Sequence, residues 1–468
     1  MKFGGTSVAD GERIAHVAGL AKSYSDNGDE VAIITSALAG VTDTLLDCAN
    51  VASGNGTVAH IHEVIIDISK KHHDAAHVAI GDVGGNALIL DRVLSYIDGR
   101  MDELEKALIG ICYLGELTQR SIDYISSFGE RLCAPILSGA IEAMGTQSRS
   151  FTGGEAGIVT DDKYGDAKPL DESYSNIADC IKPLMFNSIP VITGFIGMNK
   201  SGIITTLGRG GSDFSAAIVG AAVGADEIWL WKEVHGILTT DPRIVPTATT
   251  IPVLSYIEAM ELSYFGAKVL HPRTIEPAIK HGIPVRVKNT FEPEFAGTLI
   301  VKDDAPTKEV VKAVTLIRNA ATINICGAGM IGTIGVAARA FSALAGAGVN
   351  IIMISQGSSE ANLSMVVDES HVQWAIQALE AEFINGVVGE ITYDVDICVV
   401  AAVGAGMAGI PGVAGRVFGA MGKSGVNIVM ISQGSSQHNI SFVVSGKDAE
   451  GAVNALHSEF ELDKQMLK

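Results

Sequence analysis

The stretch Lys2-Phe3-Gly4-Gly5-Thr6-Ser7, at the start of the chain, is the segment that most narrows the choice of fold. It places one cation, two glycines and two hydroxyl groups in one turn, and a helix-like pattern follows at residues 8–24. The glycines let backbone N–H groups approach an anion closely, and the N-terminus of the next helix adds partial positive charge. The lysine precedes the glycines, so this is not the Gly-x-x-x-x-Gly-Lys-Ser/Thr loop of P-loop enzymes. Alone, the stretch fits a phosphate-binding turn and a plain Gly-rich turn equally well.

Short apolar runs that recur through residues 1–300 predict the buried strands of a mainly parallel sheet. Helical patterns and turns rich in Gly and Pro separate these runs, and residues 57–127 are mostly helical in pattern. The runs are Val31–Thr35, Val191–Thr193, Glu227–Trp231 and Val285–Val287. Such alternation is typical of a sheet covered by helices on both faces, so we expect a three-layer αβα domain over residues 1–300.

The C-terminal part contains an internal duplication. Residues 348–359, Gly-Val-Asn-Ile-Ile-Met-Ile-Ser-Gln-Gly-Ser-Ser, recur at residues 425–436 with one conservative change. Each copy reads as strand, helix, strand, strand and helix, and a further strand candidate, Val310–Leu316, precedes the first copy. We therefore expect two similar domains, at residues 310–388 and 389–468, after a hydrophilic joint at residues 301–309.

Composition restricts the class of protein and its partners. The 468 residues carry 33 Lys and Arg against 53 Asp and Glu, a net charge of −20, which argues against binding to nucleic acid or to an anionic membrane. Six scattered cysteines without a Cys-x-x-Cys pair, and a start without a signal-peptide core, favour a cytoplasmic protein without disulfides or a structural metal site. The apolar stretch at residues 397–415 is broken by glycines and Pro411, so it predicts a buried strand and turn.

A second Gly-rich turn, Gly208-Arg-Gly-Gly-Ser-Asp213, follows a strand-like run and opens a helix of small residues. Arg209 can bind a carboxylate or phosphate through two hydrogen bonds, and Ser212 with the backbone N–H groups can hold an anion. Asp213 can bind an ammonium group or orient a metal, or it can simply cap the helix.

Three further segments place polar groups after predicted strands or at helix starts. Ser36 and Thr42 follow a strand, where open α/β sheets bind ligands, although Thr42 can equally cap the next helix. Glu130, in Ser-Phe-Gly-Glu-Arg, can receive an ammonium group or be an ordinary solvated residue. Lys232 and Arg243 bring cations to a region that is either a binding loop or a surface loop, and Lys268 is similar.

Two other patterns are weaker. The Gly-x-Gly-x-x-Gly matches at residues 327–332 and 404–409 lack the acidic residue that a dinucleotide site needs at the end of the next strand. His73 and His77 lie one turn apart, but no Cys or carboxylate pattern supports a metal site, so a solvated helix is favoured.

Together, these stretches resemble the aspartate kinases, in family order and over the whole chain. The matching stretches are Lys-Phe-Gly-Gly-Thr-Ser at 2–7, Ser-Ala-Leu-Ala-Gly-Val-Thr-Asp at 36–43, Phe-Gly-Glu-Arg-Leu at 128–132, Thr-Leu-Gly-Arg-Gly-Gly-Ser-Asp at 206–213, Thr-Thr-Asp-Pro-Arg at 239–243 and Phe-Gly-Ala-Lys-Val-Leu-His-Pro-Arg-Thr at 265–274. The resemblance implies an amino-acid-kinase fold followed by two ferredoxin-like ACT (βαββαβ) domains. It also implies transfer of a phosphoryl group from ATP to L-aspartate, giving L-4-aspartyl phosphate for lysine, threonine and methionine synthesis.

The resemblance also implies roles for individual residues. The catalytic residues would be Lys2, Arg209 and Asp213, with Lys2 opposing the charge on the transferred phosphoryl group. Contacts to aspartate would come from Ser36, Thr42, Glu130, Arg209, Ser212 and Asp213. Contacts to ATP, carried with Mg²⁺, would come from Lys2, Gly4, Gly5, Ser7, Lys232, Glu233, Leu238, Arg243, Lys268 and Val269. The family usually has Thr-Asp-Val-Asp-Gly where this chain has Lys-Glu-Val-His-Gly, at residues 232–236.

For the paired ACT domains, the resemblance implies feedback control by a small amino acid, with threonine favoured and lysine second. The expected effector contacts are Asn350, Gln356, Asn362, Asn427, Gln433 and Asn439. Pairing of ACT domains between chains implies a homodimer or homotetramer. The rival interpretations are another amino-acid kinase, acting on glutamate or acetylglutamate, and a non-catalytic amino-acid sensor. No segment follows residue 468, so we expect no fused homoserine dehydrogenase.

Overall fold

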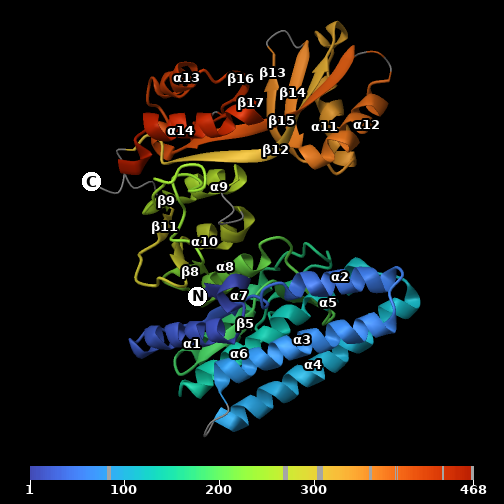
Figure 1. Cartoon of the computed structure of the whole chain (residues 1–468), viewed down its shortest axis with the longest axis vertical. Coiled ribbons are helices and arrows are strands. Elements are labelled where there is room, and N and C mark those ends of the chain that lie inside the picture. Colours follow the sequence, from blue (N-terminus) through green and yellow to red (C-terminus); the bar gives the residue numbers. More distant parts are fainter. Residues whose placement is uncertain are drawn as a thin grey trace. The chain divides into compact units, whose positions relative to one another are not determined.

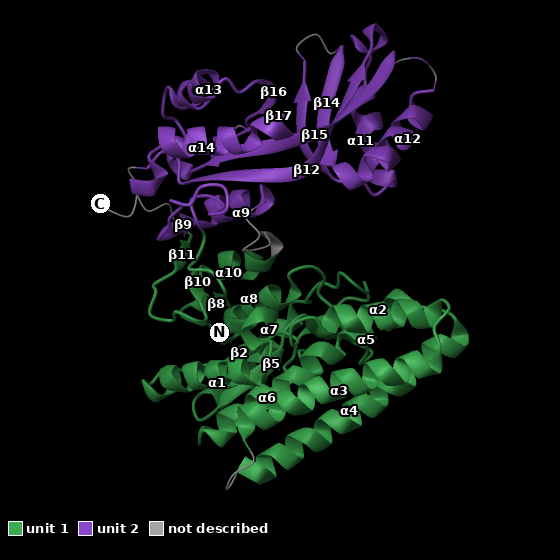
Figure 2. Cartoon of the chain, viewed as in Figure 1, with its two compact units in different colours: residues 1–237, 270–302 green, residues 238–269, 303–468 purple. Residues whose placement is uncertain are grey.

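The computed structural model describes residues 1–81, 86–266, 272–302, 309–357, 361–384, 386, 388–434 and 437–464. It divides into two compact units (Figure 2): residues 1–237 with 270–302, and residues 238–269 with 303–468. The division differs from the boundary near residue 300 that the sequence suggests, because residues 238–269 group with the C-terminal unit. Val245, for example, belongs to a hydrophobic core cluster that also contains Val311, Val400 and Phe442.

A mainly parallel sheet forms the centre of the first unit, as predicted. Its strands in this unit are ordered β3-β5-β2-β1-β8-β10-β11, and its pairs are parallel apart from the antiparallel β10–β11 pair. The strands are β1 (Lys2–Phe3), β2 (Ile33–Thr35), β3 (Ser148–Phe151), β5 (Ile189–Thr193), β8 (Ile228–Lys232), β10 (Val285–Asn289) and β11 (Thr298–Val301). A small second sheet contains β4 (Val159–Thr160), β6 (Ile196–Asn199) and β7 (Ile204–Thr206).

Helices cover the main sheet on both faces, which confirms the three-layer prediction (Figure 1). One layer contains α1 (Gly11–Asp26) and α6 (Phe128–Ala143), backed by α3 (Val58–Ile80) and α4 (Asn86–Leu114). The other contains α7 (Glu172–Met185), α8 (Gly211–Val223) and α10 (Glu276–His281). Near the carboxyl ends of the strands lie α2 (Val41–Ser53) and α5 (Gln119–Ser126). None of the described helices combines the length and the apolar character that crossing a membrane requires.

The strand β1 is only two residues long, yet it lies in the middle of the sheet. Lys2 pairs with Ile34 on one side and with Leu230 on the other, and the buried Phe3 stacks on Trp231. The chain therefore leaves β1, β2 and β8 at the same edge of the sheet. In parallel sheets this carboxyl edge is where ligands bind.

The second unit contains a six-stranded antiparallel sheet in the order β13-β14-β12-β15-β17-β16. Its strands are β12 (Ala313–Cys326), β13 (Ile351–Gln356), β14 (Asn362–Asp368), β15 (Glu390–Val403), β16 (Ile428–Ser432) and β17 (Asn439–Ser445). Among the described residues, the helices that form its hydrophobic cores include α11 (Val336–Gly346), α12 (Val372–Glu382), α13 (Val413–Lys423) and α14 (Ala449–Glu459). The apolar stretch at 397–415 is thus the end of β15, a turn and the start of α13, as predicted.

The long strand β12 is shared by the two copies of the duplication. Its first part, Ala313–Ile317, pairs with residues 399–403 of β15, and its second part, Ala320–Cys326, pairs with β14. Between the two parts the register shifts, and Asn319 has a φ of +57°. We call the two copies module 1 (residues 320–397) and module 2 (residues 397–464 with residues 313–317). The domain boundaries expected from sequence, 310–388 and 389–468, place residues 313–317 with the first copy. In the structure these residues pair with the part of β15 that belongs to module 2.

A short segment that precedes the modules in sequence also belongs to this unit. It contains β9 (Val253–Ser255) and α9 (Tyr256–Tyr264), and a single bridge joins Leu238 to Thr250. The helix α9 begins with a capping box, in which Ser255 and Glu258 exchange side-chain and backbone hydrogen bonds.

Candidate active site

A cavity of about 750 Å³ opens in the first unit at the carboxyl edge of the parallel strands. It brings together predicted residues from β1, α2, α6, the Gly-rich turn before α8, and β8. These residues are Lys2, Thr42, Glu130, Arg209, Ser212, Asp213 and Lys232. Segments more than 200 positions apart in the sequence thus contribute to one site, because parallel strands end at the same edge of the sheet.

Asp213 lies between two lysines in this cavity. Its Oδ1 is 2.6 Å from Nζ of Lys2, and its Oδ2 is 2.9 Å from Nζ of Lys232. Burial lowers the pKa of Lys2, and the charge of Asp213 counteracts this effect. Burial alone would raise the pKa of Asp213, but Lys2 and Lys232 outweigh it and hold that pKa below its ordinary value. Two cations face one carboxylate, so this cluster retains a net positive charge that can attract a phosphate.

Glu130 is a buried carboxylate in the first turn of α6. Its Oε2 has no hydrogen-bond partner within the described residues, and burial raises the pKa of Glu130 to about 8. Gly129 allows close approach of the loop before α2 and of Thr42 in its first turn: a Cβ there would lie 2.7 Å from the Cβ of Ala37 and 3.1 Å from Oγ1 of Thr42. An unsatisfied buried carboxylate that lines a cavity can accept a cationic group from a ligand.

The Gly-rich turn before α8 presents its groups to the same cavity. Gly208 and Gly210 both have a φ of +74°, a conformation that favours glycine, and Gly210 caps α8. Ser212 packs closely against Gly194, where a Cβ would lie 2.7 Å from the Cβ of Ser212. Arg209 is exposed to solvent at the cavity, so its guanidinium can reach a bound anion. The N–H groups at the start of α8 favour an anion at this position.

Asp123, on α5, is a cavity residue that the sequence reasoning missed. It is buried and accepts hydrogen bonds from the backbone N–H of Thr206 at 2.9 Å, from Oγ1 of Thr206 at 2.9 Å and from the N–H of Gly165 at 3.0 Å. Burial raises its pKa despite these bonds. Asp123 thereby fixes the end of β7, two residues before Gly208. Its sequence context, Gln-Arg-Ser-Ile-Asp, carries no motif, and the only available signal was an acid on the apolar side of a helix.

Several predicted residues lie outside the set that lines this cavity. In the first unit these are Gly4, Gly5, Ser7, Ser36 and Glu233. Gly5 approaches the neighbouring loop, since a Cβ there would lie 3.2 Å from the carbonyl oxygen of Ala37. The hydroxyl of Ser7 bonds to Oγ1 of Thr290 at 2.7 Å.

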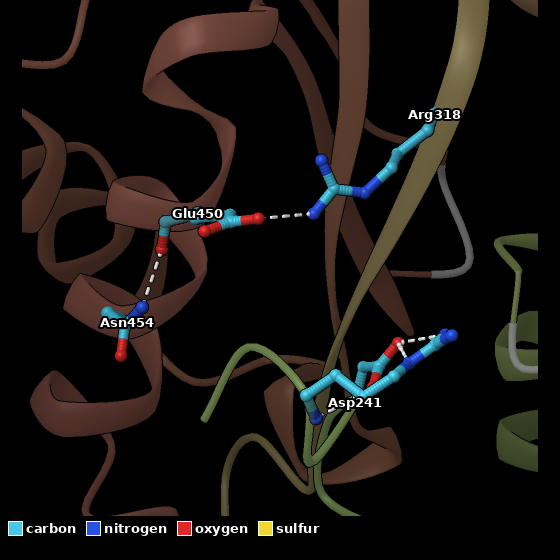
Figure 3. A network of polar contacts seen from close by, with 5 residues as sticks. Asp241, Arg318, Glu450 and Asn454 are labelled. Atoms are coloured by element: carbon cyan, nitrogen blue, oxygen red, sulfur yellow. Dashed lines mark hydrogen bonds and ion pairs between the residues drawn. The ribbon is translucent and has the colours of Figure 1, made fainter. Parts of the chain in front are cut away.

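The remaining ATP residues fall on the segment that belongs to the second unit. Leu238 begins this segment, and Arg243 forms an ion pair of 2.6 Å with Asp241, the loop residue drawn in Figure 3. Lys268 and Val269 lie outside the described residues.

The predicted effector residues lie on the second unit in different surroundings. Gln356 lines a cavity of about 360 Å³ beside the start of α11, and Asn362 lines another of about 330 Å³. Asn427 and Gln433 lie before and after β16. The amide of Asn439 donates to the carboxylate of Glu261 on α9, and Asn350 lies directly before β13.

Comparison with known proteins identifies the family. The model of the amino acid kinase family matches residues 1–289, and the ACT domain model matches residues 323–383 and 400–460. Aspartokinase 1, chloroplastic, of Arabidopsis thaliana is 36% identical over 473 residues, covering 98% of this chain and 79% of that protein. The chain belongs to the aspartokinase family.

Two solved structures of an aspartokinase align with this chain over nearly its full length. E. coli aspartokinase III in complex with aspartate and ADP aligns with a TM-score of 0.78 at 28% identity, over 98% of both chains. The same enzyme in complex with lysine and aspartate aligns with a TM-score of 0.79 at 27% identity, again over 98% of both chains. The chain is therefore an ATP-dependent kinase that acts on aspartate and carries ACT regulatory domains. The resemblance that the sequence motifs indicate is confirmed.

Proposed function

We propose that the cavity of the first unit holds aspartate and the reacting phosphoryl group, and that the product is L-4-aspartyl phosphate. The observation that carries this proposal is the convergence of Lys2, Glu130, Arg209 and Asp213 on one cavity. Their charges match the groups of aspartate and of a nucleotide: two anions and one ammonium group on the amino acid, and phosphates on ATP.

The chemistry requires little from the protein beyond placement and charge. The side-chain carboxylate of aspartate is ionised at neutral pH, so it attacks the γ-phosphorus of ATP without a general base. The bond from this phosphorus to the bridging oxygen breaks, and ADP leaves. Lys2 stabilises the negative charge on the phosphoryl group during transfer, and Lys232 supplies a second cation beside it. Asp213 keeps both ammonium groups at the cavity wall, at 2.6 and 2.9 Å.

The amino-acid end of the substrate is recognised by opposite charges. Arg209 pairs with the α-carboxylate through its planar guanidinium, and Glu130 receives the α-ammonium group. The resemblance gives this second role to Asp213 as well, but both oxygens of Asp213 already pair with lysines, so we assign it to Glu130. Ser36, Thr42 and Ser212 complete the contacts to substrate oxygens.

Mg²⁺ fits this arrangement as a companion of ATP. Among the described residues, no group of three or more His, Cys, Asp and Glu side chains could hold a metal ion. Mg²⁺ commonly binds through substrate phosphates with few protein ligands, and there it neutralises phosphate charge. The nucleotide contacts that the resemblance assigns to Gly4, Gly5, Ser7, Glu233, Leu238, Arg243, Lys268 and Val269 belong to this proposal.

We further propose feedback inhibition at the ACT modules, with threonine as the first candidate and lysine as the second. Threonine is favoured by the repeated Ile-Ser-Gln-Gly-Ser-Ser, which carries Gln356 and Gln433, and Gln356 lines a cavity of suitable size. Lysine is kept because it is bound in the E. coli aspartokinase III complex. Association through the ACT modules into a dimer or tetramer, and a cytoplasmic location, stay predictions from sequence.

Trapping the product tests the reaction. Hydroxylamine converts an acyl phosphate into a coloured hydroxamate, so the chain is incubated with ATP, Mg²⁺ and either L-aspartate or L-glutamate. We expect hydroxamate with aspartate only, and less of it when threonine is added. Turnover with glutamate alone would instead support another amino-acid kinase. No turnover with either amino acid would support a non-catalytic amino-acid sensor.

A single substitution tests the effector. Threonine inhibition should weaken in Gln433→Ala while uninhibited turnover stays unchanged. Unaltered inhibition in this variant would show that Gln433 is not part of the effector site. If lysine inhibits and threonine does not, lysine is the effector.

A further inference from the structure

Two segments of the first unit meet at the Gly-rich turn before α8. The strand β7 ends at Thr206, two residues before Gly208, and the carbonyl of Thr206 accepts from the N–H of Ala167 at 2.9 Å. Gly208 lies against the same loop, since a Cβ there would lie 3.1 Å from the carbonyl oxygen of Gly165. The turn therefore starts at a junction between β7 and the loop at residues 161–168.

Asp123 holds both sides of this junction. Its Oδ2 accepts from the backbone N–H groups of Gly165 at 3.0 Å and of Thr206 at 2.9 Å, and its Oδ1 accepts from Oγ1 of Thr206 at 2.9 Å. The side chain of Gln119 is a further hydrogen-bond partner of this carboxylate. Asp123 is buried, and hydrogen bonds to an ionised acceptor are stronger than those between neutral groups. One side chain thus fixes two backbone segments that are distant in sequence.

The partners of Asp123 argue against a direct role in binding aspartate. Asp123 lines the cavity, as Glu130 does. Glu130 keeps an oxygen without a partner among the described residues, whereas both oxygens of Asp123 accept hydrogen bonds from Thr206. A carboxylate whose bonds are already made gains little from an ammonium group. Asp123 consequently acts on the site through the segments that it holds.

Arg209 depends on the turn for its direction. Its guanidinium forms no hydrogen bond or ion pair with another described residue. The N–H of Gly211 donates to the carbonyl of Gly208 at 3.0 Å, so Arg209 and Gly210 are the central residues of a turn closed by this bond. A side chain at such a position extends where the backbone directs it. A displacement of Gly208 therefore displaces the guanidinium as well.

We propose that Asp123 is a positioning residue for Arg209, and that it sets the affinity of the cavity for the α-carboxylate of aspartate. The proposal rests on the role of Arg209 proposed above. Asp123 fixes the end of β7, this strand fixes the turn, and the turn directs the guanidinium. Arg209 holds the α-carboxylate both before and during phosphoryl transfer, so a displaced guanidinium raises the KM for aspartate and leaves kcat nearly unchanged.

The test compares Asp123→Ala with the isosteric Asp123→Asn in steady-state kinetics. The alanine variant loses every hydrogen bond of the side chain. The asparagine variant keeps an oxygen for the two backbone N–H groups and an amide that can donate to Oγ1 of Thr206. For Asp123→Ala we expect the KM for aspartate to rise about tenfold, with kcat and the KM for ATP within about twofold of the unmodified chain.

The asparagine variant separates positioning from direct binding. In Asp123→Asn the KM for aspartate should stay within about threefold of the unmodified value, because the hydrogen bonds are retained. A residue that binds the ammonium group directly would lose affinity in both variants, since asparagine carries no charge. A KM in Asp123→Asn as high as that in Asp123→Ala would therefore overturn the proposal.

Asp161→Ala is the matched control. Oδ1 of Asp161 accepts from the backbone N–H groups of Lys163 at 3.2 Å and Lys168 at 3.0 Å, so it holds the same loop, and it is not among the residues that line the cavity. Its KM for aspartate should stay within about twofold of the unmodified value. An equal rise in Asp161→Ala and Asp123→Ala would trace the effect to the loop rather than to the turn, and would overturn the proposal.

A second variant keeps the test decisive if Asp123→Ala does not fold. Thr206→Val removes one hydroxyl group and keeps a branched side chain that suits a strand. We expect it to raise the KM for aspartate about threefold, without a change in kcat. Thermal melting shows whether each variant is folded before its kinetics are compared.

A double variant shows whether Arg209 carries the effect. Arg209→Met should itself raise the KM for aspartate, and adding Asp123→Ala, or Thr206→Val in its place, should raise it by less than about twofold more. The full effect of Asp123→Ala in the Arg209→Met background would overturn the proposal, as would an unchanged KM in folded Asp123→Ala. If Arg209→Met alone leaves the KM unchanged, the proposed role of Arg209 fails and this inference fails with it. A raised KM in Arg209→Met beside an unchanged KM in Asp123→Ala rejects the inference and leaves the role of Arg209 standing.

Discussion

Each unit of the molecule buries a carboxylate beside lysine, and the two clusters differ in how completely their charges are matched. In the first unit Asp213 is shared by Lys2 and Lys232 at the wall of a cavity, and the nearby Glu130 has an oxygen without a partner. In the second unit Glu258 has one lysine, Lys312, together with two backbone N–H groups.

The difference distinguishes a ligand-binding site from a structural contact. The first cluster has polar groups that a ligand can pair with, whereas the second has its partners within the protein. Buried charges without matching partners cost stability, and charged groups of a bound ligand can offset that cost. A pair whose hydrogen bonds are all made gains nothing from a ligand and instead fixes the elements that carry it. The changes below test whether the clusters behave in these two ways, and an exposed ion pair provides a comparison.

The largest expected effect follows from removing Lys2. Lys2→Met deletes the cation that opposes charge on the transferred phosphoryl group, so kcat should fall by about a thousandfold. Melting temperature should change little, because Asp213 keeps Lys232 as a partner. A coupled assay of ADP release measures kcat.

Lys232→Met provides the control for this change and should lower kcat by about tenfold. If Lys232→Met proves as damaging as Lys2→Met, the roles of the two lysines have been assigned in the wrong order.

Removing Lys312 should lower the stability of the protein, whereas removing Lys2 should lower kcat. Lys312→Met leaves Glu258 buried without its counter-ion, so the free energy of unfolding should drop by about 3 kcal/mol or more. Urea denaturation followed by circular dichroism measures this change. The double variant Lys312→Met with Glu258→Gln removes the buried charge and keeps a side-chain oxygen that can accept a backbone N–H bond, so it should be more stable than Lys312→Met alone. A double variant as unstable as the single one would contradict the ion-pair explanation.

A smaller effect comes from the titration of Glu130. Its pKa of about 8 lies above the ordinary value, so Glu130 is mostly protonated at pH 7. An arriving ammonium group needs the ionised form, whose fraction falls about tenfold per pH unit below the pKa. The KM for aspartate should therefore fall as pH rises from 6 to 8 and then level off.

Steady-state kinetics over this range, with ATP saturating, measure the dependence. Glu130→Gln should show a raised KM for aspartate that no longer changes with pH in this way. A pH profile identical to that of the unmodified chain would remove Glu130 from the ammonium site.

The smallest effect is expected at an exposed pair in the second unit. Arg318 lies 2.7 Å from Glu450, with side chains 48% and 63% exposed (Figure 3). Solvent screens such pairs, so Arg318→Met should change the free energy of unfolding by less than about 1 kcal/mol. The same denaturation assay applies, and a loss equal to that of Lys312→Met would erase the distinction between exposed and buried pairs.

The sequence predicts much of the kinase fold, because parallel strands have strong local signals. The apolar runs at 31–35 and 227–231 and the Gly-rich turns mark the carboxyl edge, and they make Lys2 and Arg209 candidates for an anion site. Glu130 joins them only through the family resemblance, because its own sequence context fits an ordinary solvated residue equally well. The two-residue strand β1 has no such signal, and it is held in place by pairing on both sides rather than by its own composition.

What the sequence could not predict depends on contacts between distant residues. The hydrogen bonds of Asp123 to Thr206 span 83 residues, and the ion pair of Glu258 with Lys312 spans 54. Neither residue stands in a motif that names its partner. The grouping of residues 238–269 with the ACT modules is hidden for the same reason, since local pattern does not reveal which sheet a helix packs against.

The sharing of β12 between the modules has a consequence for protein engineering. Residues 320–397 leave module 2 and return to it on neighbouring strands, so they form an insertion that can be exchanged as one cassette. A truncation that keeps residues 1–388 would strip Ala313–Ile317 of their neighbours on β15 and expose bare backbone hydrogen-bonding groups. Chimeras that aim to transplant effector specificity therefore have their natural crossover points on either side of the register shift at Asn319 and near residue 397.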